Sequence, residues 1–132
     1  IQTARNQGYL MKAGLVFYPE SNLVYGIKLL NEASKSKNSL ISSEANYFLA
    51  RIYHENDFKI DSSLYHYGIL TKNYPNNLIY LYYELNAMIK AKFPKETLLK
   101  KKQKAIDLAY KNPQLILNQS SYLKNLFNEL KF

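Results

Sequence analysis

Apolar residues recur along the chain at the three- and four-residue spacing of amphipathic helices, and no segment alternates apolar and polar residues as a strand does. Prolines occur only at positions 19, 75, 94 and 113, each between two such stretches, where they mark helix ends. The pattern therefore predicts an all-α fold. The predicted helices span residues 3–18, 21–36, 42–55, 61–73, 77–92, 94–111 and 113–130.

Small and apolar residues fall at matching positions when the successive helix pairs are aligned. In the first helix of each pair, Gly14, Ala50 and Leu85 fall together, and a large residue follows three positions later. In the second helices, Gly26 aligns with Ser63. The other aligned sets are Phe17, Tyr53 and Met88; Leu30 and Tyr67; Ala33 and Leu70; and Asn38, Pro75 and Pro113, which end the pairs. Such a period of under 40 residues indicates a repeat architecture.

This spacing resembles the tetratricopeptide repeat, a helix-turn-helix motif of about 34 residues. The first repeat matches without insertion and the second with one extra residue in its turn, whereas the third has Glu84 and Leu85 in place of a large and then a small residue. The resemblance implies a solenoid of about three helix pairs in a single domain over residues 1–132. Its parts would be repeats 7–40, 42–76 and 77–112 and a closing helix 113–130. An ordinary helical bundle with scattered alanines is the alternative.

Small residues in the repeat are expected where two helices approach each other closely, at the low end of the usual helix separation of about 8–10 Å. The small residues in question are Gly14, Gly26, Ala50 and Ser63. Large aromatic residues would fill the space between successive helix pairs.

The resemblance also implies a binding surface, since the first helices of such repeats line the inner face of the solenoid. The residues that it places there are Met11, Leu15, Tyr18, Tyr47, Arg51, His54, Tyr82, Asn86 and Lys90. Tyrosine and arginine often dominate binding energy. We therefore expect a non-catalytic scaffold that binds a protein or peptide partner. Packing of several of these residues against a further N-terminal repeat is the competing interpretation. Met11 and Leu15 stand where co-chaperone members carry the basic and amide residues of a carboxylate clamp, so that ligand class is not expected.

Positive charge is concentrated in residues 90–111. This segment contains eight lysines and two acidic residues, a net charge of 8 − 2 = +6 within a chain of +8. The candidate basic patch consists of Lys95, Lys100, Lys101, Lys102 and Lys104. It indicates an alternative function, binding of an acidic protein, an anionic surface or nucleic acid. Nucleic acid is less favoured because Arg5 and Arg51 are the only arginines. A solvated helix face is the simpler interpretation.

Residue types that support chemistry are scarce. The chain has no cysteine, and His54 and His66, with Glu55, Asp57 and Asp61, show no catalytic or metal-ligand spacing. We therefore expect no enzymatic activity, no cofactor and no metal. No apolar run is long enough for a transmembrane segment. The chain begins at Ile1 without methionine, so a processed protein or a piece of a longer chain is expected, and both a cytoplasmic and an exported location stay open.

Overall fold

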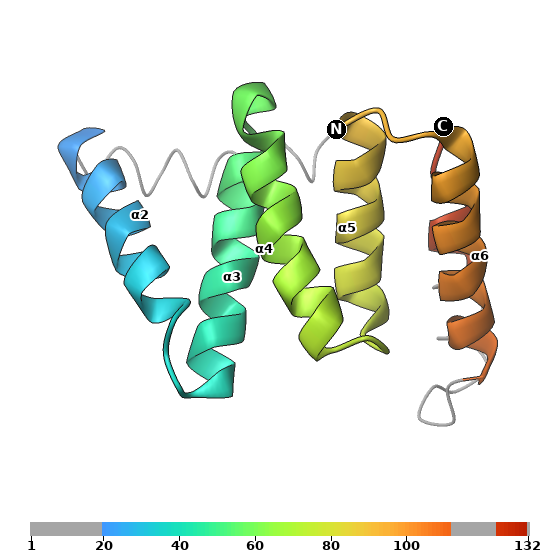
Figure 1. Cartoon of the computed structure of the whole chain (residues 1–132), viewed down its shortest axis with the longest axis horizontal. Helices are drawn as coiled ribbons and strands as arrows, with labels where there is room; N and C mark the ends of the chain where they lie inside the picture. Colours follow the sequence, from blue (N-terminus) through green and yellow to red (C-terminus); the bar gives the residue numbers. More distant parts are fainter. Residues whose placement is uncertain (1–19, 112–123, 132) are drawn as a thin grey trace. The chain divides into compact units, whose positions relative to one another are not determined.

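The computed structural model describes residues 20–111 and 124–131, and the regular structure in these two ranges is entirely helical (Figure 1). The all-α prediction is thus confirmed for this part of the chain. The elements are α2 (Glu20–Ala33), α3 (Ser39–His54), the short 3₁₀ helix η1 (Asp57–Lys59), α4 (Ile60–Asn73), α5 (Leu78–Lys90), α6 (Lys95–Lys111) and a helical turn over 124–128. The helix predicted over 3–18, with Gly14, lies outside the described residues.

Helix ends lie within three residues of their predicted positions, and side-chain caps explain two of the starts. The Asn38 side-chain oxygen accepts hydrogen bonds from the amides of Leu40 and Ile41, at 3.0 and 3.3 Å. Asn77 likewise accepts from two amides of α5, each at 3.1 Å. Such caps satisfy amides that have no partner within the helix. Helix α3 therefore begins three residues before its predicted start at 42, and Asn77 stands before α5 rather than in it.

The end of α5 has an unusual backbone at Lys92, whose φ of 60° lies in the left-handed region. The Lys92 amide donates to the carbonyl of Ile89 at 3.0 Å, and the Phe93 amide donates to that of Met88 at 3.1 Å. These two bonds form a Schellman motif, in which glycine is the usual left-handed residue. The helix consequently stops before Pro94.

Two compact units make up the chain, Ile1–Ala45 and Asn46–Phe132, with the division inside α3. In the N-terminal unit, the Ser42 hydroxyl donates to the carbonyl of Ser34 at 2.7 Å. A side chain added at Gly26 would meet no described atom within 4 Å. The close approach predicted at Gly26 involves the helix over 3–18, so it lies outside the described residues.

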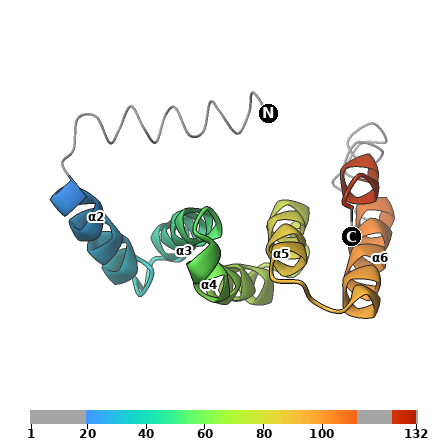
Figure 2. The ribbon, with the colours of Figure 1, turned by 90° about the horizontal axis from the view of Figure 1, so that it is seen from above.

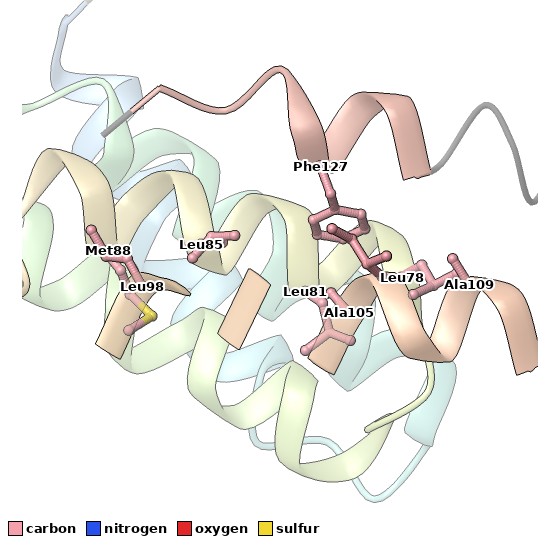
Figure 3. Packing of buried hydrophobic residues seen from close by; sticks show 9 residues of the cluster. Leu78, Leu81, Leu85, Met88, Leu98, Ala105, Ala109 and Phe127 are labelled. Carbon is pink, nitrogen blue, oxygen red and sulfur yellow. The ribbon is translucent and has the colours of Figure 1, made fainter. Parts of the chain in front are cut away.

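The C-terminal unit holds the main hydrophobic core, in which α4 packs on α5 and α5 packs on α6. Figure 2 shows these three helices in chain order. Phe127, from the helical turn 124–128, is fully buried, and its ring lies against the residues of α5 and α6 (Figure 3). This core cluster contains Leu78, Leu81, Leu85, Met88, Leu98, Ala105, Ile106, Ala109 and Phe127. In the described part of the predicted closing helix 113–130, residues 124–128 are helical and Phe127 is packed in the core.

A second core cluster joins α3, α4 and α5 and consists of Ala50, Tyr67, Leu70 and Ala87. Beside it, the Ser63 hydroxyl donates to the carbonyl oxygen of Ala50 at 2.7 Å. The close approach predicted at Ala50 and Ser63 is thus found between α3 and α4. In α5 the small residue of this cluster is Ala87, whereas Leu85, aligned with the small positions by sequence, belongs to the core cluster around Phe127.

Candidate functional site

Three residues predicted to bind a partner, Tyr47, Arg51 and His54, lie on one face of α3 because they are separated by four and three positions. All three are half-buried. The guanidinium carbon of Arg51 lies 4.7 Å from the ring centroid of Tyr83 on α5, at cation–π distance. The Tyr47 ring meets that of Tyr83 edge-on, with centroids 5.8 Å apart. Tyr47 and Arg51 of α3 thus contact Tyr83 of α5, which the sequence analysis did not predict as a binding residue.

The rings around Arg51 form a continuous tyrosine cluster, made of Tyr47, Tyr67, Tyr80 and Tyr83. Tyr67 and Tyr83 are stacked, with centroids 6.2 Å apart. Burial, and then the Tyr83 hydroxyl, raise the pKa of Tyr47, and burial raises the pKa of Tyr67. Both phenols are therefore neutral at physiological pH, which leaves Arg51 as the charged member of the group. The run Tyr80-Leu81-Tyr82-Tyr83 was the available signal for this cluster.

Lys90, another predicted partner-binding residue, makes structural contacts at the end of α3. Its ammonium donates to the carbonyl oxygen of His54 at 2.5 Å and forms an ion pair with Asp57 at 2.9 Å. A cation at this place stabilises the carbonyl end of a helix. Burial, and then the nearby Lys90 charge, lower the pKa of His54. His54 is therefore neutral at pH 7, and its Nδ1 is buried without a partner among the described residues.

The remaining predicted residues do not all join this surface. Tyr82 packs edge-on against Phe127, with ring centroids 5.8 Å apart, so it covers the core cluster. Asn86 is half-buried on α5. The residues predicted from the first repeat, Met11, Leu15 and Tyr18, lie outside the described ranges.

His66 lies among packed residues of the C-terminal unit. It is buried on α4, and its Nδ1 lies 2.8 Å from the side-chain oxygen of Asn46. Because an amide oxygen only accepts, Nδ1 carries the proton. Burial lowers the pKa of His66, which keeps the ring neutral. In the two described ranges, no group of three or more His, Cys, Asp or Glu residues is arranged to hold a metal ion.

A cleft of about 470 Å³ opens between α4, α5 and α6. Three residues of the predicted basic patch, Lys100, Lys101 and Lys104, line it, whereas Lys95 and Lys102 do not. Their spacing, with Thr97 one turn before, places them on one face of α6. Lys72, Thr71 and Gly68 of α4 and Glu84 of α5 complete the polar part of the lining. Lys72 was missed because it belongs to a different predicted repeat.

The charges in this basic cleft are partly paired. Lys101 forms an ion pair of 2.6 Å with Glu84, and Lys100 one of 3.0 Å with Glu96. Among the described residues, Lys72 and Lys104 have no ion-pair partner. The second carboxylate oxygen of Glu84 is buried and has no described hydrogen-bond partner. Four lysines and two carboxylates leave a local charge of 4 − 2 = +2.

Comparisons with family models, with curated proteins and with solved structures give no match for this chain. In the described part of the chain, no helix combines the length and the apolar character needed to cross a bilayer.

Proposed function

We propose that this chain is a non-catalytic interaction module that binds a protein or peptide partner through the face formed by α3 and α5 around Arg51. The observation that supports it best is the half-buried Arg51, held over the Tyr83 ring beside Tyr47. Arginine and tyrosine are enriched at the energetically dominant positions of interfaces.

Pre-organisation adds to this support. Tyr47 contacts Tyr80 and Tyr83, and Tyr83 stacks on the buried Tyr67, so the accessible rings already have fixed positions. A partner then immobilises few side chains on binding, which reduces the entropic cost of association. A surface of tyrosine rings with one cation suits a peptide that offers an apolar side chain and a carboxylate.

A tetratricopeptide-like solenoid is the architecture that we propose for this module. The hydrogen bond from Ser63 to Ala50, and the burial of Tyr67 and Leu70 beside it, support the assignment of the second repeat. In that arrangement α3 and α5 are first helices of successive repeats, and their shared face is the binding surface.

The experiment is a selection of peptides from a random display library against the purified chain. Binding of the recovered peptides should weaken about tenfold or more in Arg51→Ala and Tyr47→Ala, as expected for dominant interface residues. Tyr65→Ala is the matched control, because Tyr65 is an exposed aromatic residue of α4. Peptides that bind all three variants equally well would refute the proposed surface.

Anion binding is a second candidate function. It is favoured by one observation, that three lysines of α6 and one of α4 line the same cleft. If the lysines of α6 formed only a solvated helix face, a lysine of α4 would not need to line the same cleft.

A further inference from the structure

We infer that the basic cleft between α4, α5 and α6 binds a phosphate monoester group. This inference rests on the anion-binding candidate and names its site and ligand chemistry. The cleft draws its donors from two helices: Lys72 from α4, and Lys104 with its neighbours from α6. A group bound there would be surrounded by donors rather than attracted to a flat charged face.

The available charge matches a dianion. Lys72 and Lys104 have no described ion-pair partner, and the Lys100–Glu96 pair is exposed, with 77% and 80% of the two side chains accessible, so water and salt weaken it. Lys101 is held by Glu84, which fixes its ammonium at the wall of the cleft. The local charge of +2 complements a phosphate monoester, which carries about −1.5 to −2 at pH 7, better than a single carboxylate.

The donor set also favours phosphate. Lysine acts as a compact point charge that can approach the phosphate oxygens from several directions, whereas arginine offers a planar fork that matches a carboxylate. Arg51, the arginine that the structure describes, is not in the lining. The hydroxyl of Thr97 adds a neutral donor. That of Thr71 donates to the carbonyl of Gly68 at 3.3 Å, so it can offer the ligand an acceptor oxygen.

Space for the ligand comes in part from Gly68. A Cβ added there would meet no described atom within 4 Å, so the position opens to free space in the lining. The volume of about 470 Å³ lies within the range of small-ligand sites. Two sources of the group are compatible with this geometry, a free polyol phosphate and a phosphorylated serine side chain.

The test is an NMR titration of ¹⁵N-labelled protein at low salt with glycerol 3-phosphate and, separately, with N-acetyl phosphoserine amide. Saturable shifts are expected at the amides of Gly68, Thr71 and Thr97. Lys72→Gln and Lys104→Gln should each weaken binding by up to about fivefold, the upper end for an exposed ion pair. Lys95→Gln, the same change on α6 outside the cleft, should leave the affinity nearly unchanged. The tighter of the two ligands identifies the source.

Gly68→Leu supplies an independent steric test, because it fills the cleft without removing a charge. Loss of phosphate-ester binding in this variant, with an unchanged helical circular dichroism spectrum, supports the site. Absence of saturable binding by the wild type, or equal weakening by Lys95→Gln and Lys104→Gln, overturns it.

Binding to heparin distinguishes failure of the phosphate site from failure of the anion-binding function. If heparin binds and the triple reversal of Lys100, Lys101 and Lys104 to Glu abolishes that binding, but neither phosphate ester binds, the phosphate site is wrong and the anion-binding function stands. If none of the three binds, both are wrong.

Discussion

The side-chain hydroxyl of Ser63 donates a hydrogen bond of 2.7 Å to the main-chain carbonyl of Ala50, and both residues are fully buried. A bond from a serine side chain to the backbone of another helix requires the two backbones to lie close together. Ala50 and Ser63 thus allow α3 and α4 to meet over Tyr67 and Leu70, which form the surrounding core cluster.

Ala50→Leu should lower the free energy of unfolding by about 1–3 kcal/mol, because the added side chain overpacks this contact and separates Ser63 from its acceptor. Urea denaturation followed by circular dichroism measures the change. Phe48→Leu, at an exposed position of the same helix, should change stability by less than about 0.5 kcal/mol. Equal stability of Ala50→Leu and wild type would mean that the helices do not meet as described.

Lys92→Gly should raise the free energy of unfolding by about 1 kcal/mol. Lys92 has a φ of 60°, and an L-residue pays a steric penalty in this region that glycine avoids. The matched control is Lys95→Gly, in the first turn of α6, where glycine should be neutral or destabilising. A loss of stability in Lys92→Gly would show that the α5 terminus adopts another conformation.

Gly68→Ala should raise the free energy of unfolding by about 0.5–1 kcal/mol, since glycine inside a helix is less favourable than alanine by that amount. The added methyl would meet no described atom within 4 Å, so no steric cost opposes the gain. Thermal and urea denaturation measure it. A destabilised variant would indicate that another segment packs on Gly68.

Prediction from sequence succeeded where one helix determines the outcome and was incomplete where several helices meet. The spacing of apolar residues and prolines located α4 to within one residue at its start, because helix periodicity is a local property. The small residues at Ala50 and Ser63 indicated their close approach correctly. Tyr83 and Lys72 were missed because their roles depend on which neighbour faces them. Lys90 was predicted to bind a partner, and its bond to the carbonyl of His54 was not predicted, because it depends on how α5 lies beside the end of α3.

Acidification should destabilise the C-terminal unit through His66. Burial lowers its pKa in the folded state, so below the unfolded-state pKa of about 6.5 the unfolded chain binds the proton more readily. This contribution to stability is complete above that pKa and is lost as the pH falls toward the lowered folded-state value. His54 contributes with the same sign. Urea denaturation from pH 7.5 to 5 should therefore show falling stability, with a smaller pH dependence in His66→Gln. An unchanged slope in this variant would exclude His66 as a source.

Substitutions at Arg51 and at Tyr82 should have different effects, one on partner binding and the other on stability. Arg51 lies over the Tyr83 ring, so Arg51→Met keeps an apolar stem but removes the cation. The cation–π contact itself contributes only about 0.5–1 kcal/mol, so its loss should leave the variant folded, while peptides selected against the wild type should bind about tenfold or more weakly. Tyr82 packs on Phe127, so Tyr82→Ala should instead lower the free energy of unfolding and leave the affinity of the folded protein nearly unchanged. Urea denaturation and peptide titration of both variants measure the two effects. If Tyr82→Ala removes binding at full stability while Arg51→Met does not, the binding face lies toward α6, and the surface proposed around Arg51 is wrong.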